Sequence, residues 1–190
     1  MSQVATLRSA VFPRATTYSK ALLITVGAMF IAGLAQIALP IPGSPVPVTG
    51  QTLGVLLVGA GYGSTLGLST LVTYLLIGIA GAPVFAKGGS GLADLTGPTG
   101  GYLIGMLVAS LLVGALAGRR WDQKLRSAIP AMLLGDIVIF SFGLYWLHAY
   151  THQSWSWTIA AGFTPFLIGE ALKIAIAGTS LPLVWRLVQR

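Results

Sequence analysis

Glu170 and Lys173 are the residues of this sequence best suited to hold a polar ligand. They lie three positions apart within an apolar stretch, so they occupy one face if that stretch is helical. Ionisable side chains are costly in apolar surroundings, and those that occur there face the protein interior or a polar partner. The pair is therefore expected to be either a ligand or ion site or a structural ion pair that joins two helices.

Further polar residues are candidates for the same site. Asp136 is another acidic residue within an apolar stretch, where it could contact a ligand, pair with Lys173 or cap a backbone break. Thr49 and Gln51, followed by Thr52, come directly after a proline-rich passage and can present hydrogen-bonding groups at the start of a helix. Because a glutamine at a helix start is often only a cap, both interpretations stay open.

A glycine-rich loop and nearby aromatic residues supply the remaining candidates. Lys87, close to Phe85 and several glycines, could attract an anion and close over it, or could be a solvated charge. Phe85, Tyr74 and Tyr102 offer aromatic walls for an apolar part of a ligand, although a tyrosine can also anchor a helix at a membrane surface.

The composition defines the surroundings of these residues. Of the 190 residues, 55% are hydrophobic and 8% are charged, and no charged residue occurs between Lys20 and Lys87. Such a chain cannot cover a water-soluble surface with polar side chains. We expect an all-α integral membrane protein in which residues 1–190 form a single membrane domain. At about 20 residues per span the chain has room for about six helices and none for a soluble ATPase domain.

The apolar stretches and the residues that interrupt them predict a six-helix bundle with proline- and glycine-rich outer loops. The expected helices cover residues of about 20–39, 49–62, 64–81, 98–118, 127–149 and 164–188. The last helix is expected to begin with Thr164 as its N-cap and Pro165 in its first turn. The second helix is too short to cross the membrane by itself, so we expect it to be partly re-entrant or shielded by protein.

The basic residues predict the orientation of the bundle. Nine of the 11 Lys and Arg residues lie on one side if the N-terminus is cytoplasmic: Arg8, Arg14, Lys20, Arg119, Arg120, Lys124, Arg126, Arg186 and Arg190. The positive-inside rule therefore places both termini in the cytoplasm and the proline- and glycine-rich loops outside. A site built from these loops opens to the outside.

Several other functions find little support in the sequence. The basic residues form no single patch beside aromatic residues, which argues against nucleic-acid binding, and no cluster has metal-ligand spacing. Ser90 lies in a GxSG motif like the nucleophile of a rhomboid-like intramembrane serine protease, but His148 and His152 precede the last helix, where the activating base is needed. Ala28 and Ala32 form a small-residue face that suits either a partner subunit or packing within the chain.

Three passages resemble one known family. They are PVPVTGQTLGVLL (45–57), GAPVFAKGGSGLADLTGPTGGYLIG (81–105) and FTPFLIGEALKIAIAG (163–178), and the block ending in GPTGGY is the most specific. The likeness, which extends from about residue 21 to residue 188, is to the BioY family, the biotin-binding S components of energy-coupling factor (ECF) transporters.

The resemblance implies a biotin-capture subunit of a bacterial cytoplasmic membrane, without a cofactor of its own. Biotin would enter an outward pocket, and a transmembrane scaffold subunit with two ABC-type ATPases would drive its transport, the scaffold docking at Ala28 and Ala32. Lys173 matches the lysine of the family's last helix, whereas Glu170 stands where many members have aspartate. A standalone biotin permease is the alternative, and a homo-oligomer stays open.

Overall fold

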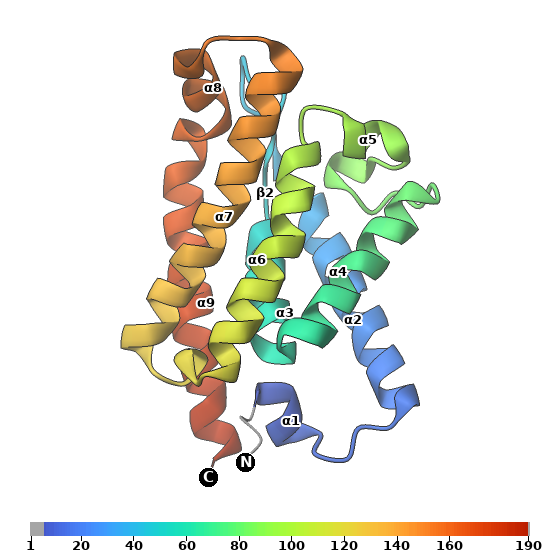
Figure 1. Ribbon diagram of the computed structural model, residues 1–190, viewed down its shortest axis with the longest axis vertical. Helices are drawn as coiled ribbons and strands as arrows, with labels where there is room; N and C mark the ends of the chain where they lie inside the picture. Colours follow the sequence, from blue (N-terminus) through green and yellow to red (C-terminus); the bar gives the residue numbers. More distant parts are fainter. Residues whose placement is uncertain (1–5, 190) are drawn as a thin grey trace.

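The computed structural model describes residues 6–189 and is built almost entirely from helices (Figure 1). In chain order the elements are α1 (Leu7–Val11), α2 (Thr17–Gln36), β1 (Ala38–Leu39), β2 (Val48–Thr49), α3 (Gln51–Tyr62), α4 (Ser64–Ile79), the 3-10 turn η1 (Ala86–Gly88), α5 (Leu92–Thr96), α6 (Gly100–Gly118), η2 (Trp121–Gln123), α7 (Leu125–Thr151), α8 (Trp155–Gly162), η3 (Thr164–Phe166) and α9 (Leu167–Val188).

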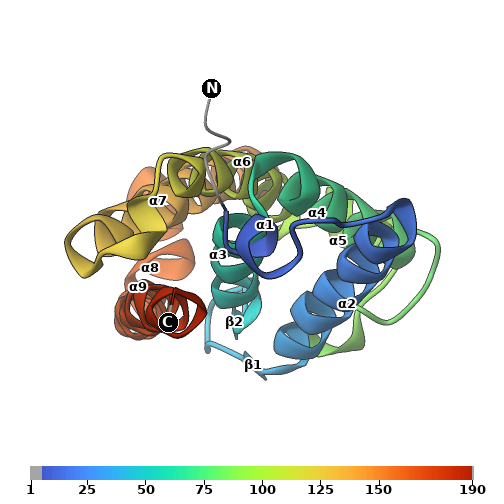
Figure 2. The same ribbon diagram turned by 90° about the horizontal axis from the view of Figure 1, so that it is seen from below.

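The helices form a bundle in which α3 is surrounded by its neighbours. Viewed along the bundle, α4, α6 and α7 form a curved row, while α2 and α9 flank α3 on the open side of that row (Figure 2). α6 and α7 approach closely because Gly105 has no side chain, and a Cβ there would lie 2.9 Å from the Cα of Ile139. α1 and the end of α9 lie at one end of the bundle, and α5, α8 and the strands lie at the other (Figure 1).

The six expected helices agree with α2, α3, α4, α6, α7 and α9 to within three residues at each end. The expected count of six spanning helices is not confirmed. In the described part of the chain, four helical stretches are long and apolar enough to cross a membrane, whereas α3 and α4 are shorter. The sequence thus predicted the order of the helices along the chain. It did not predict how many of them are long and apolar enough to cross a membrane.

The predicted N-cap of the last helix, Thr164, is wrong, because α9 begins at Leu167 and follows the 3-10 turn η3. A separate short helix, α8, precedes it and begins at Trp155, where the Ser154 side chain caps it by accepting a hydrogen bond from the Trp157 N–H. Thr164 does not cap a helix; its hydroxyl donates to the Ile159 carbonyl, and Pro165 lies in η3 before α9 begins. The connection that was expected between the last two helices is therefore partly helical.

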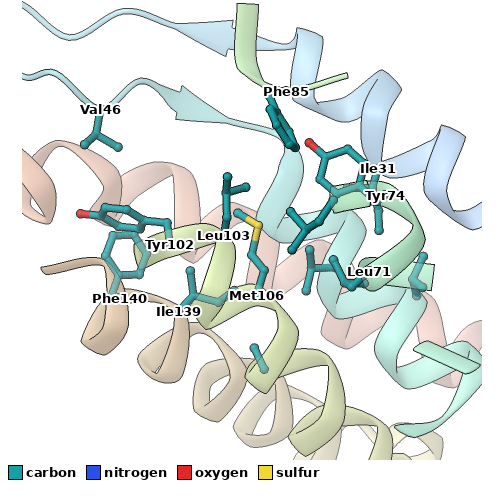
Figure 3. Close-up of a cluster of buried hydrophobic side chains, with 14 of the residues drawn as sticks. Ile31, Val46, Leu71, Tyr74, Phe85, Tyr102, Leu103, Met106, Ile139 and Phe140 are labelled. Carbon is teal, nitrogen blue, oxygen red and sulfur yellow. The ribbon is translucent and has the colours of Figure 1, made fainter. Parts of the chain in front are cut away.

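The proline- and glycine-rich loops also contain more secondary structure than expected. The proline-rich passage is flanked by β1 and β2, which pair antiparallel with Ala38 opposite Thr49. The glycine-rich loop contains η1 and α5. These short elements fix the backbone at this end of the bundle, near a buried cluster that includes Tyr74, Phe85, Tyr102 and Phe140 (Figure 3).

Candidate functional site

A cavity of about 220 Å³ lies among the proline- and glycine-rich loops and the adjoining parts of α3, α6, α7 and α9. Its walls are polar on one side and apolar on the other. The polar side includes Thr49, Gln51, Thr52 and Glu170, and the apolar side includes prolines of the β1–β2 connection and aromatic residues of α6, α7 and η3. A cavity of this kind can hold a ligand that has a polar end and an apolar body.

Glu170 is the acidic residue deepest in the polar wall, and Lys173 holds it in place. Lys173 Nζ lies 2.6 Å from Glu170 Oε1 and donates further hydrogen bonds to Thr52 Oγ1, at 3.1 Å, and to the Thr49 carbonyl. Thr52 Oγ1 donates to the second carboxylate oxygen of Glu170 at 2.8 Å. Because all three ammonium protons are used within the protein, Lys173 supports the site from behind and does not line the cavity.

A chain of hydrogen bonds extends from this network to the glycine-rich loop. Thr49 Oγ1 donates to Gln51 Oε1 at 3.1 Å, and Gln51 Nε2 donates to Tyr74 Oη at 2.7 Å. The Tyr74 hydroxyl then donates to the Val84 carbonyl at 3.0 Å. Gln51 faces the cavity, whereas Tyr74 lies behind it and connects the wall with the loop.

Aromatic rings form the apolar wall. The Tyr102 ring lies 5.7 Å from the ring of Phe140, edge to face, and 6.4 Å from that of Phe166, stacked. The Tyr102 hydroxyl donates to the Gly162 carbonyl at 2.8 Å, so the polar end of this side chain is satisfied away from the cavity. Such a wall suits an apolar ring or an alkyl chain.

Phe85 and Lys87 cover the cavity from the glycine-rich loop. Phe85 is buried and packs edge to face on Tyr74, with ring centroids 5.6 Å apart (Figure 3). Its ring fits there because Gly78 has no side chain. Lys87 is exposed and lines the cavity on the same side as Asp94. The loop therefore brings a cation to the mouth of a cavity that has a carboxylate deeper inside.

Asp136 is not part of the main cavity. It lines a separate cavity of about 210 Å³ between α7 and α9, together with Glu170. The predicted alternative of an Asp136–Lys173 pair is not observed, since Lys173 contacts Glu170 instead. Asp136 Oδ1 is buried and has no hydrogen-bond partner within residues 6–189. Asp136 thus lines the same cavity as Glu170 but forms no ion pair with Lys173.

The two alanines of the small-residue face differ in accessibility. Ala28 is buried within the chain, whereas Ala32 is only partly buried beside the same core cluster. A Cβ at Gly27 would lie 2.8 Å from Thr70 Cγ2 and 2.9 Å from Tyr62 Cε2, so packing within the chain accounts for part of this face. Ala32 keeps accessible surface.

Three residues at or near the site were not singled out from the sequence. Thr52, considered only as one of several polar residues, bonds both members of the ion pair. Phe140 lies in a uniformly apolar stretch and carries no distinguishing signal. Gln36 contacts the glycine-rich loop and was not considered at all. No three His, Cys, Asp or Glu side chains of the described residues gather as a metal site.

Comparison with known proteins gives a consistent result. The model of the BioY family matches residues 7–190. The biotin transporter BioY2 of Lactococcus lactis subsp. cremoris is 39% identical over 165 residues, which cover 84% of this chain and 87% of that protein. The biotin transporter BioY of Thermotoga maritima is 34% identical over 137 residues, covering 72% of this chain and 79% of that protein.

A solved structure agrees with this result. The crystal structure of the S-component for biotin from an ECF-type ABC transporter superposes with a TM-score of 0.80 at 26% sequence identity. The match covers 93% of this chain and 95% of the other.

Proposed function

Since the chain belongs to the BioY family, we propose that it captures biotin in the outer cavity and delivers it for uptake into the cell. The observation that carries the proposal is the polarity of the cavity, which has the Glu170 carboxylate in one wall, aromatic rings in the other and Lys87 at the mouth. Membership of a family of transporter components also excludes the serine protease based on Ser90.

The chemistry of biotin is complementary to this cavity. The ureido ring has two N–H donors and one carbonyl acceptor. We place the N–H groups toward Glu170, and the Thr52 and Gln51 side chains within reach of the same ring. The sulfur-containing ring and the alkyl chain would lie against Tyr102, and the carboxylate would lie near Lys87. Lys173 would act indirectly, because its donors are already used.

We further propose that the chain is the substrate-capture subunit of an ECF-type transporter, with a membrane scaffold subunit and two ABC-type ATPases as partners. The similarity to a biotin S-component from such a transporter supports this assembly. The scaffold would dock on α2, where Ala32 and an apolar stripe are accessible. We place the chain in the bacterial cytoplasmic membrane, with the basic residues and both termini inside and the cavity open to the outside.

Uptake of labelled biotin into biotin-auxotrophic cells tests this function. The cells should lack their own biotin transporter and should express this chain alone or with a complete ECF module. We expect uptake at nanomolar biotin only when the module is present. Equal uptake without any module would contradict the ECF partnership and favour a standalone permease. Absence of uptake under both conditions, from a chain that reaches the membrane, would contradict biotin transport.

A further inference from the structure

Gln36 is the last residue of α2 and lies on the exposed face of that helix. The exposed residues of this face follow a spacing of three and four positions along the helix. They are Tyr18, Leu22, Val26, Met29, Gly33 and Gln36. All but the last are apolar or aromatic, so this stripe faces lipid or an apolar partner and ends in an amide at the outer end of the bundle.

Both the nitrogen and the oxygen of the Gln36 amide form hydrogen bonds with backbone groups. Its Nε2 donates to the Ala32 carbonyl at 3.0 Å, one turn back along α2, and to the Phe85 carbonyl at 3.2 Å. Its Oε1 accepts a hydrogen bond from the Gly88 N–H at 3.0 Å. One side chain therefore ties α2 to both ends of the turn from Phe85 to Gly88.

This turn carries the two residues of the glycine-rich loop that cover the cavity. It is closed by a hydrogen bond from the Gly88 N–H to the Phe85 carbonyl at 3.2 Å, and Lys87 within it adopts a φ of +58°. A left-handed conformation at a lysine is unfavourable and persists only when surrounding contacts enforce it. Gln36 supplies such contacts on either side of Lys87.

The same turn is held from the site by a second route. Val84, directly before the turn, accepts the hydrogen bond of Tyr74, which is linked through Gln51 and Thr49 to the Lys173 network. The turn is thus fastened to the polar wall by Tyr74 and to α2 by Gln36. Of these two contacts, only the one through Gln36 involves a residue on the exposed surface of the bundle.

We propose that Gln36 is a positioning residue that latches the Phe85–Gly88 turn over the cavity and thereby links the position of α2 to the closure of the site. The proposal rests on the proposed biotin-binding function and assigns the cover of that site to a residue outside it. α2 is well placed for such a role, because only 22% of its apolar span is buried inside the chain. A partner that docks on the exposed stripe would meet Gln36 directly.

The rate of biotin release tests the latch. We expect Gln36→Ala to release bound biotin about fivefold faster, because two hydrogen bonds that hold the cover are lost. The association rate should change little, since the cavity walls are untouched. Gln36→Met keeps the volume of the side chain without its polar atoms and should behave like Gln36→Ala. Thr25→Ala is a matched control on α2, because its hydroxyl bonds only within the helix, to the Ala21 carbonyl.

A spin label gives a readout that is independent of biotin. The chain has no cysteine, so Ser90→Cys and Gln189→Cys each accept a single nitroxide label. Gln36→Ala should increase the mobility of the label at Ser90, next to the turn, and leave the label at Gln189 unchanged. Unchanged mobility together with unchanged release would overturn the proposal, as would wild-type release in Gln36→Met. If the unsubstituted chain does not bind biotin, the proposed function fails, while the Ser90 label still tests the latch.

Discussion

Glu170 and Lys173 are adjacent, yet they have different relations to the cavity. Glu170 lines it with a carboxylate that is held by Thr52 and Lys173, whereas Lys173 spends its three donors on the protein. A fixed carboxylate presents its free lone pairs in one orientation, which favours a ligand with N–H donors at a defined spacing. We therefore expect Lys173 to affect binding indirectly, by orienting Glu170 and compensating its charge.

Substitution of Asp136 tests whether a second carboxylate belongs to the binding site. We expect Asp136→Asn to raise the thermal unfolding temperature and to change biotin affinity by less than about threefold. The reason is that Asn keeps the shape but removes a buried carboxylate that lies beside Glu170 and has an oxygen without a partner in the described chain. Thermal unfolding in detergent and equilibrium binding measure the two effects. A large loss of affinity would instead make Asp136 a ligand contact.

Sequence reasoning identified many of the residues that line the cavity, but few of the contacts between them. The spacing of Glu170 and Lys173 predicted a shared face, and the ion pair confirms that they are neighbours. Nothing local could show that Lys173 would reach Thr49, more than 120 positions earlier in the chain. The sequence could not identify Phe140 as a residue of the cavity wall, because nothing distinguishes it from the other apolar residues of its helix.

At the scale of elements, the cover of the cavity depends on close packing between α4 and the glycine-rich loop. A Cβ on Gly78 would lie 2.1 Å from Cζ of Phe85. We expect Gly78→Ala to displace the Phe85 ring from Tyr74 and to weaken biotin binding about tenfold, with helix content unchanged. Binding and circular dichroism measure these effects. Gly118→Ala, which adds a methyl group where nothing lies within 4 Å, is the matched control; equal affinity of the two variants would show that the Phe85 position is unimportant.

The connection between α6 and α7 is fastened to α9 by a buried acid. Trp185 Nε1 donates to Asp122 Oδ2 at 2.5 Å, and burial raises the pKa of the Asp122 carboxyl from its usual 3.8 to about 6. A carboxyl whose folded-state pKa is raised binds its proton more tightly in the folded state, so its contribution to stability declines as the pH rises from about 4 to about 6.

Asp122→Asn should therefore be stabilising above pH 6 relative to the unsubstituted chain, and the advantage should shrink toward pH 4. Asn can still accept the Trp185 hydrogen bond but carries no charge. Thermal unfolding of both proteins across this pH range measures the difference. An advantage that does not depend on pH would show that the Asp122 charge is not the cause.

Element boundaries were predictable where composition changes sharply and wrong where caps decide. The apolar stretches located α2, α3, α4, α6 and α7 because charge or clustered Pro and Gly interrupts them. Thr164 and Pro165 begin the 3-10 turn η3, so α9 itself starts three residues later than predicted. Helix α8, which was not predicted, begins at Trp155 with a cap by Ser154 within a polar, aromatic segment.

At the scale of the whole molecule, the cavity and the basic residues lie toward opposite ends of the bundle. η2, α1 and the end of α9, which carry or adjoin most of the basic residues, lie away from α5, α8 and the β strands (Figure 1). This separation agrees with the expected orientation, in which an external ligand enters at the outer loops. The expected orientation itself rests on the distribution of the basic residues.

Labelling of intact cells tests the orientation. Thr96→Cys lies in α5 and Gln189→Cys follows α9, and both positions are exposed. A membrane-impermeant maleimide should label the cysteine at position 96 in intact cells and the one at position 189 only after the cells are opened. The reverse pattern would place the cavity on the cytoplasmic side and would contradict a role in capture from outside.

Equilibrium binding of labelled biotin to the detergent-purified chain tests the central claim most directly. We predict tight binding at one biotin per chain. Lys173→Ala should weaken it roughly 30-fold or more, because losing one partner of a buried charge pair leaves Glu170 uncompensated and typically costs about 2–5 kcal/mol. Lys124→Ala, at an exposed lysine next to η2, should bind as the unsubstituted chain does. Absence of binding by a folded sample, or equal affinity of Lys173→Ala and the unsubstituted chain, would contradict a biotin site organised around Glu170 and Lys173.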